Sequence, residues 1–209
     1  MQIAVIVYHK NAQNIYPAHW IEKFRESILG QTFQDFSLFE VDYGGSDYRI
    51  FQNSIYESRS LPSFVWAMNY LIDSIFNAGY DCIANTNCDD YFSIDRLEKQ
   101  IPFIEQGFDI VSSNFSLVKD DEITLTHEFD KVDIQKELAR NHNPICHPVI
   151  CMSRNFWIYN RYIPSQVPTE DMELWKRGIR NGFKFKILPD VLCYHRLHPE
   201  SIGHKLKEE

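Results

Sequence analysis

The first half of the chain alternates short apolar runs with segments whose apolar residues recur at helical spacing. Four runs have the length and composition of buried strands: residues 3–8, 36–41, 83–85 and 108–112. Three intervening segments have the period of an amphipathic helix: residues 20–29, 64–75 and 97–104. Strands that alternate with helices in this order form a mostly parallel sheet with helices on both faces, so the sequence predicts an α/β fold.

Glycines and a capping residue mark the ends of these helices. Gly30 and Gly79 follow the first two helical segments, where a residue without a side chain often ends a helix. Ser93 is predicted to cap the third helix, with Asp95 in the first turn, where the helix dipole favours a carboxylate.

The second half of the chain is less regular. Its predicted elements are a loop tip at 119–122, a short helix within 132–140, a strand at 145–152, a helix at 172–180 and closing strands at 185–188 and 191–194. Pro148 interrupts the strand at 145–152, and because proline cannot donate to a strand ladder, this strand is predicted at a sheet edge. We find no repeat and no second core, so a single domain is expected.

Composition argues against several classes of protein. The formal net charge of −8 argues against a nucleic-acid partner, because the phosphate backbone requires a basic surface. No segment approaches the roughly 20 consecutive apolar residues of a membrane span, which leaves only peripheral membrane association open. The apolar start lacks a preceding basic region and is predicted to be a strand rather than a signal peptide. The five cysteines form no CxxC pair, so we expect reduced thiols in a cytoplasmic protein.

Adjacent carboxylates follow the third predicted strand. Asp89 and Asp90, in the segment Asn87-Cys88-Asp89-Asp90, lie at the edge where open α/β sheets hold ligands. Two carboxylates this close repel one another unless a cation or a shared proton lies between them. The segment therefore predicts a site for a divalent metal that carries a phosphorylated substrate. Capping of the following helix is the alternative, although one carboxylate would suffice for it.

Other polar groups also fall at predicted strand and helix ends. Asp42 precedes Gly44-Gly45, a pair that either lets a ligand approach the backbone or forms a turn capped by the carboxylate. Glu170 and Asp171 open a helix, where the dipole alone favours carboxylates. Tyr8 ends the first strand and would either stack on a flat ligand or belong to the core edge. A basic cluster lies near the C-terminus: His195, Arg196 and His198.

Taken in order, six segments resemble those of the family 2 glycosyltransferases, which have the GT-A fold. They are the helix-to-strand junction at 29–36, the nucleotide loop at 41–47, the DxD segment at 87–98, the strand before the acceptor side at 147–150, the ED-x-x-L/W element at 170–175 and the closing R-x-H-x-x-S segment at 196–201. The resemblance implies one domain over residues 1–209, with a nucleotide-binding half at 1–114 and an acceptor-side half at 115–209. It is compatible with the catalytic part of a longer protein.

The resemblance implies a hexosyltransferase-type enzyme that moves a sugar from a nucleotide-diphosphate donor to a glycan, lipid or protein hydroxyl, with inversion. Asp171 would be the general base. Mn²⁺ or Mg²⁺ on the diphosphate would be held by three side chains: Asp89, Asp90 and His198. The implied nucleotide contacts are Tyr8, Asn69, Arg196 and Asp42. Asp42 would accept the imide N–H of the base, which favours UDP, although the guanine of GDP also offers an N–H.

The chain departs from the family pattern at several positions. Asn87 stands where the DxD segment has its first acid, so metal binding would depend mainly on Asp89. Met68 replaces a common arginine, and Tyr43 and Gly45 replace the more usual Asp and Ser of the nucleotide loop. These departures leave the donor sugar open.

Two other functions stay open from the sequence. A non-catalytic domain that binds a sugar nucleotide or a glycan would keep the same fold. A metal-dependent phosphohydrolase or nucleotidyltransferase would use the same carboxylates, but a sugar nucleotidyltransferase would be expected to have a glycine-rich loop where residues 8–13 contain no glycine. Acceptor loops are expected at 115–145 and 155–168. Four aromatic residues of the second loop would contact a sugar or belong to the core: Phe156, Trp157, Tyr159 and Tyr162.

Overall fold

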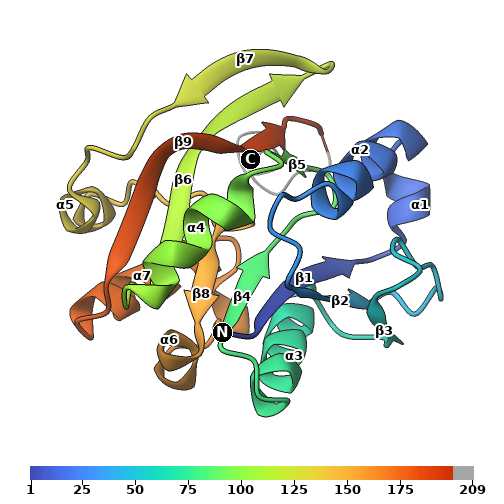
Figure 1. Ribbon diagram of the computed structural model, residues 1–209, viewed down its shortest axis with the longest axis horizontal. Helices are drawn as coiled ribbons and strands as arrows, with labels where there is room; N and C mark the ends of the chain where they lie inside the picture. Colours follow the sequence, from blue (N-terminus) through green and yellow to red (C-terminus); the bar gives the residue numbers. More distant parts are fainter. Residues whose placement is uncertain (200–209) are drawn as a thin grey trace.

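The structure, a computed structural model, describes residues 1–199, in which nine strands form one mixed sheet (Figure 1). The strands are β1 (Ile3–His9), β2 (Ser37–Asp42), β3 (Ile55–Ser58), β4 (Cys82–Asn85), β5 (Tyr91–Phe92), β6 (Ile110–Lys119), β7 (Glu122–His127), β8 (Cys151–Ser153) and β9 (Phe185–Arg196). Their order is β3-β2-β1-β4-β8-β6-β9-β5, and β7 pairs with β6 outside this path. The predicted α/β class is confirmed.

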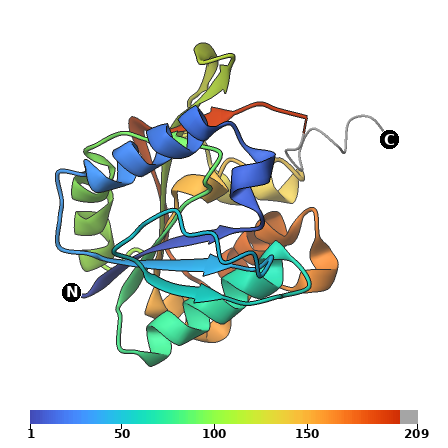
Figure 2. The ribbon, with the colours of Figure 1, turned by 90° about the vertical axis from the view of Figure 1, so that its right-hand side faces the viewer.

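Helices cover both faces of the sheet, as predicted. They are α1 (Ala12–Ile15), α2 (Ala18–Leu29), α3 (Phe64–Asn77), α4 (Arg96–Glu105), α5 (Ile134–Ala139), α6 (Arg154–Tyr159) and α7 (Glu170–Arg180), with 3-10 turns at His147–Val149 and Pro164–Gln166. Successive side chains of β1 point to opposite faces, so Val5 packs with α2 and α4 while Ala4 and Ile6 pack with α3, α6 and α7. Figure 2 shows this layering, with α2 above the strands and α3 below them.

The parallel strands bring the polar ends of three elements to one edge of the sheet. β1 pairs in parallel with β2 and with β4, and β2 pairs in parallel with β3. In this register His9 lies opposite Asp42, and Asp42 lies opposite Ser58. The carboxyl ends of these strands are therefore the base of the candidate site.

The strand predicted at residues 145–152 is shorter than expected and does not lie at an edge. Only Cys151–Ser153 forms β8, which runs antiparallel between β4 and β6 in the interior of the sheet. Pro148 lies before this strand, in the 3-10 turn His147–Val149, where a proline has no ladder hydrogen bond to make. The proline that suggested an edge position is therefore outside the strand.

The closing strands predicted at 185–188 and 191–194 form one continuous strand, β9, parallel to β6. The register with β6 shifts on both sides of Asn114, and the Asn114 amide donates to the Pro189 carbonyl (3.0 Å) at the irregular position. β6 extends beyond the predicted 108–112 and forms a hairpin with β7, whose tip is the predicted loop at 119–122. β7 was not predicted, because its side chains are exposed and carry no buried apolar pattern.

The N-cap of α4 is Asp95 rather than Ser93. The Ser93 hydroxyl donates to the Asp95 carboxylate (2.5 Å), and the Ser93 carbonyl accepts from the Arg96 N–H. Ser93 therefore supports the turn before the helix, and α4 begins at Arg96. Asp95 is also paired with Lys99 one turn later (2.7 Å).

No helix within residues 1–199 is long and apolar enough to span a bilayer. All five cysteines are buried and free. Three of the four aromatics of the 155–168 segment belong to the core, with Tyr159 alone well exposed.

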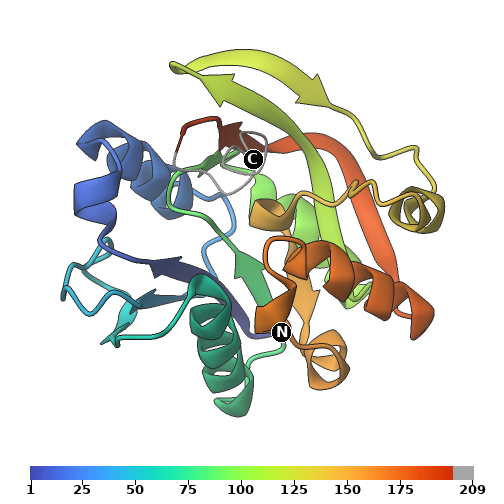
Figure 3. The ribbon, with the colours of Figure 1, turned by 180° about the vertical axis from the view of Figure 1, so that it is seen from behind.

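Helix α7, which carries Glu170 and Asp171 at its start, is fixed by close packing of its buried face. Leu174, Trp175 and Gly178 form this face, and α7 lies beside α6 in the view of Figure 3. A Cβ atom on Gly178 would lie 2.5 Å from the Phe156 ring, which is closer than any real contact. The glycine therefore sets how near α7 approaches α6.

We expect Gly178→Ala to destabilise the protein although alanine is the better helix former. The gain in helix propensity is about 1 kcal/mol, whereas overpacking a core typically costs about 1–3 kcal/mol. Urea denaturation should show a lower free energy of unfolding, and the loss should shrink in a Phe156→Leu background. An increase in stability would contradict this packing.

Candidate active site

The Asp42 carboxylate organises the loop that follows β2. Asp42 is buried; its Oδ1 accepts from the Gly44 N–H (2.9 Å), and its Oδ2 accepts from the N–H and the hydroxyl of Ser46 (2.6 and 2.7 Å). Burial opposes ionisation, but these hydrogen bonds outweigh it and lower the pKa of Asp42. The carboxylate thus caps a turn, which was one of the two interpretations, and contact with a nucleotide base stays a prediction.

The glycine pair of this loop has a local structural cause. A Cβ on Gly44 would lie 2.9 Å from Cγ of Lys10 and 3.0 Å from Oδ1 of Asn11, so a side chain there would push the two loops apart. Gly45 has a φ of +69°, in the left-handed region that disfavours other residues. The close approach is therefore to the loop after β1.

A hydrogen bond joins the end of β1 to the first position of the DxD-like segment. The Tyr8 hydroxyl donates to Oδ1 of Asn87 (2.7 Å). Burial raises the pKa of Tyr8 well above its ordinary value, and the nearby charge of Asp89 adds to the rise. Asn87 thus accepts the hydrogen bond from the Tyr8 hydroxyl. Unlike an aspartate at this position, it adds no second negative charge beside Asp89.

Asp89 and His198 are in contact, although 109 residues separate them in the sequence. Oδ2 of Asp89 lies 2.9 Å from Nε2 of His198. The imidazole also packs edge-on against Tyr16 and Trp20, with ring centroids 5.6 and 5.4 Å away. The structure therefore brings together two of the three predicted metal ligands.

Asp90, the third predicted metal ligand, has different partners. Its side chain is fully buried, Oδ1 accepts from the Arg196 N–H (2.9 Å), and the carboxylate forms an ion pair with Nδ1 of His195 (3.0 Å). The charge of Asp90 raises the pKa of His195 to about 10, so the imidazole is protonated at neutral pH. Among residues 1–199, Asp90 serves to anchor β9, and its role as a metal ligand stays a prediction.

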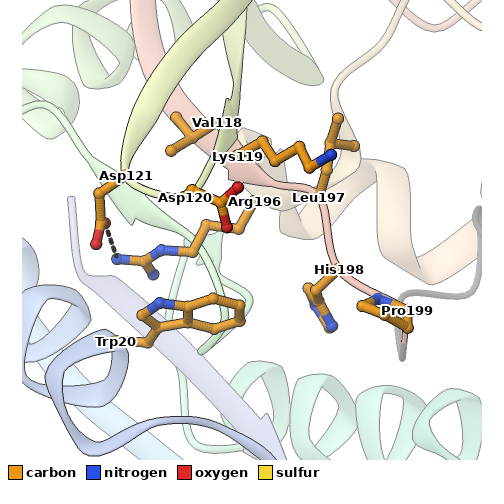
Figure 4. Close-up of a pocket in the computed structure, with 9 residues that line it drawn as sticks. All are labelled: Trp20, Val118, Lys119, Asp120, Asp121, Arg196, Leu197, His198 and Pro199. Carbon is orange, nitrogen blue, oxygen red and sulfur yellow. Dashed lines mark ion pairs between the residues drawn. The ribbon is translucent and has the colours of Figure 1, made fainter.

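Arg196 lies beside Asp89 with its guanidinium between two aromatic rings. The guanidinium carbon is 5.0 Å from the Trp20 centroid and 4.9 Å from that of Tyr91, and Nη1 donates to the Asp89 carbonyl (2.7 Å). Figure 4 shows Arg196 above Trp20 and His198 nearby, on the wall of a cavity of about 200 Å³. Ser201, the last residue of the predicted closing segment, lies outside the described residues.

The donor atoms at this corner form a partial set for a divalent metal. Within residues 1–199, no group of three or more His, Cys, Asp or Glu side chains is placed to hold a metal ion. One carboxylate and one imidazole are present, in Asp89 and His198. Mg²⁺ in phosphate sites is commonly held by one or two carboxylates together with substrate oxygens. The donors therefore fit a cation that binds with a diphosphate.

The first turn of α7 carries the predicted base. Asp171 is half-buried, and its Oδ2 accepts from the side-chain amide of Asn143 (2.8 Å), which fixes the orientation of the carboxylate. Glu170 beside it is buried, and among the described residues its Oε2 has no hydrogen-bond partner. Burial raises the pKa of Glu170 to about 7, and the charge of Asp171 adds to the rise.

His147 and Tyr162 form a buried hydrogen-bonded pair beside helix α7. Nε2 of His147 and the Tyr162 hydroxyl are 2.7 Å apart, and the Asn69 amide donates to the Tyr162 carbonyl (3.0 Å). Burial raises the pKa of Tyr162 well above its ordinary value, and the charge of Asp171 adds to the rise. Tyr162 therefore lies near the predicted base.

Three of the predicted nucleotide contacts thus have partners within the protein. Tyr8 bonds Asn87, Asn69 bonds the chain at Tyr162, and Arg196 bonds the chain at Asp89. The fourth, Asp42, also has its partners within the protein, in its own loop.

Comparisons with known proteins bear on the fold and on the class of enzyme. An Escherichia coli protein described as O-antigen biosynthesis glycosyltransferase WbnJ is 23% identical over 197 residues, which cover 84% of this chain and 74% of that protein. The structure of S. aureus TarS 1–349 in complex with UDP matches with a TM-score of 0.68 at 15% identity. The fold is that of the GT-A glycosyltransferases. WbnJ is a glycosyltransferase by name, as the sequence resemblance predicts, and no family model matches the chain.

The coverage of the structural matches is unequal. The TarS match covers 96% of this chain and 62% of that one. The mannosyltransferase PcManGT from Pyrobaculum calidifontis, in complex with GDP-Man and Mn²⁺, matches with a TM-score of 0.65 at 14% identity, over 96% of this chain and 58% of that one. The chain therefore spans about three fifths of these two proteins. Membership of family 2 stays a prediction.

Sequence analysis missed Asn143, and it named His195 only as part of the basic cluster. Asn143 holds Asp171, and His195 neutralises Asp90. These two contacts join segments far apart in the chain, so no local pattern signals them. A stack of Phe115, His127 and Phe129, with centroids 4.8 and 5.6 Å apart, lies on the hairpin side and was also not predicted.

We predict that Glu170→Gln stabilises the protein at alkaline pH. A carboxyl whose pKa rises on folding binds its proton more tightly in the folded state, so stability falls as pH rises from about 4.5 to about 7 and stays lower above it. The difference corresponds to at most about 3 kcal/mol. Urea denaturation at pH 8 should show a gain of about 1–3 kcal/mol that shrinks at pH 5. Exposed Glu105→Gln should show neither effect, and equal gains at both pH values would exclude the buried carboxylate as the cause.

Proposed function

We propose that the chain is an inverting glycosyltransferase that moves a sugar from a nucleotide-diphosphate donor, with UDP favoured, to a hydroxyl group. The observation that carries this proposal is that one GT-A fold contains two chemically different groups of functional residues, which we call corners. One corner holds Asp89, His198 and Arg196, and the other holds Asp171 on the first turn of α7. Structural neighbours were solved with UDP, with UDP-GlcNAc and with GDP-Man.

The first corner suits the leaving diphosphate. Asp89 and His198 would hold Mn²⁺ or Mg²⁺, and PcManGT was solved with Mn²⁺. Such a cation supplies charge that stabilises the leaving diphosphate. Arg196 presents a guanidinium whose planar donors match phosphate oxygens. Asp90 would support this corner by holding β9 in place. Its direct binding of the cation remains part of the prediction.

The nucleoside would bind over the ends of β1 and β2. Asp42 supports this by fixing the turn at Gly44-Gly45, and its Oδ1 carries only one hydrogen bond at short distance. We retain Asp42 as the proposed contact for the imide of the base. Tyr8, in β1, and Asn69, in α3, would contact the nucleotide after giving up or sharing their present partners.

Asp171 would remove the proton from the acceptor hydroxyl. Helix α7 places it in a first turn, where the dipole keeps a carboxylate ionised. The hydrogen bond from Asn143 leaves other lone pairs of the carboxylate available for the proton. Attack from the side opposite the diphosphate inverts the anomeric centre. The stack of Phe115, His127 and Phe129 offers apolar ring surface for an acceptor sugar.

A non-catalytic binding domain is the second candidate, and Asn87 in place of an acid favours it. Incubation with UDP- and GDP-sugars plus Mn²⁺ separates the two. Slow, donor-dependent release of nucleoside diphosphate supports the transferase. Binding of UDP with no turnover in the presence of a broad panel of acceptors supports the binding domain. The cytoplasmic location inferred from the cysteines stays a prediction.

We predict that Asp171→Asn abolishes transfer while leaving UDP affinity near that of the wild type. Loss of a general base typically costs about 10²–10⁴-fold in rate, and Asn keeps the shape and the contact with Asn143. Turnover of UDP-sugars and calorimetry with UDP measure the two properties. Exposed Asp35→Asn is the control and should change neither. Loss of UDP affinity would move Asp171 out of the base role.

We predict that Asp89→Ala removes the metal dependence of nucleotide binding. The variant loses the carboxylate that faces His198, so added Mn²⁺ should no longer tighten UDP binding in calorimetry. In the wild type, Mn²⁺ should increase UDP affinity at least tenfold, or about 1.4 kcal/mol. If UDP binds the wild type equally well with and without Mn²⁺, the metal part of the proposal is wrong.

A further inference from the structure

The tip of the β6–β7 hairpin closes over the cavity beside Arg196. Lys119, Asp120 and Asp121 of the tip line this cavity from one side, and Trp20, Arg196 and His198 line it from the other (Figure 4). Asp120 and Asp121 have φ values of +51° and +62°, which form the tight turn of the hairpin. A second, open hollow over α2 also has Asp121 on its wall. Asp121 therefore stands between the two hollows.

Arg196 has donor groups that the described part of the protein leaves unused. Its side chain is 2% exposed, and Nη1 donates to the Asp89 carbonyl. Nε and Nη2 are buried and have no hydrogen-bond partner within residues 1–199. Buried N–H groups without partners are costly, so a guanidinium on a cavity wall in this state is suited to an anionic ligand.

Asp121 partly fills the place of such a ligand. Its Oδ1 lies 3.9 Å from Nη2 of Arg196, beyond hydrogen-bond distance. The same carboxylate lies 3.5 Å from Nζ of Lys23 and 3.7 Å from Nε2 of His19 on α2. Asp121 is 45% exposed, so these loose pairs hold it only weakly.

We propose that Asp121 is an internal counter-ion of Arg196 and that the anionic diphosphate of the donor replaces it. The proposal rests on the function proposed above, because it takes a diphosphate as the ligand. A diphosphate can accept hydrogen bonds from Nε and Nη2 together, which the distant carboxylate does not. Asp121 can then remain with Lys23 and His19, since its loose contacts with them do not depend on Arg196. The hairpin tip thereby sets the affinity of the site for its anion.

The test measures affinity for inorganic pyrophosphate and for UDP by calorimetry in the full chain. Asp121→Asn removes the competing charge and keeps the hairpin turn, because asparagine tolerates positive φ. It should tighten binding of both probes about three- to tenfold. Glu122→Gln is the matched control, since it removes one negative charge from the exposed neighbour of Asp121 at the start of β7, and it should change affinity less than twofold. Circular dichroism confirms that each variant is folded.

A double-variant cycle distinguishes direct competition from a general charge effect. In an Arg196→Met background, Asp121→Asn should no longer change the affinity, because the shared partner is absent. Equal effects of Glu122→Gln and Asp121→Asn, or an undiminished effect without Arg196, would overturn the inference while leaving the proposed function in place. If neither wild type nor Asp121→Asn binds pyrophosphate, UDP or GDP, the inference and the proposed function both fail. Binding to Asp121→Asn alone would support the inference.

Discussion

The buried clamp between Asp90 and the end of β9 is the interaction on which the candidate site depends. Asp90 pairs with the His195 imidazole and accepts the Arg196 N–H, so it fixes a strand end more than 100 residues away. Removing one partner of such a buried pair typically costs about 3–5 kcal/mol, because the other charge is left without compensation. The clamp thus holds the chain end that carries Arg196 and His198, which contact Asp89 through a hydrogen bond each.

The clamp also explains why two adjacent carboxylates have different tasks. Asp90 is fully buried with partners inside the protein, whereas Asp89 contacts His198, which lines the cavity. Under the proposed function, Asp89 would exchange this contact for a cation and a diphosphate. A single turn of chain thus provides a structural anchor and a candidate ligand, and the anchor holds the partners of that ligand in place.

Four strands and three helices of the first half could be predicted, because burial on both faces and helical period leave strong local signals. The short elements α1, β3 and β5 were not predicted. The second half could not be predicted as well. Pro148 suggested an edge strand, but a 3-10 turn places it just before the interior strand β8. β7 has exposed side chains and exists because it pairs with β6. The sequence left open whether Asp42 caps a turn or contacts a ligand. The three hydrogen bonds that its carboxylate accepts show that it caps the turn.

The sequence by itself determined the α/β class, the alternation of four strands and three helices in the first half, and which polar residues fall at their ends. It determined these because periodicity and glycine positions are local properties of the chain. Tertiary structure alone decided that Asp89 meets His198, that Asn143 orients Asp171 and that Asp121 lies opposite Arg196. These contacts depend on how β6 and β9 pair and on how a hairpin tip packs against α2, which no short stretch of sequence encodes.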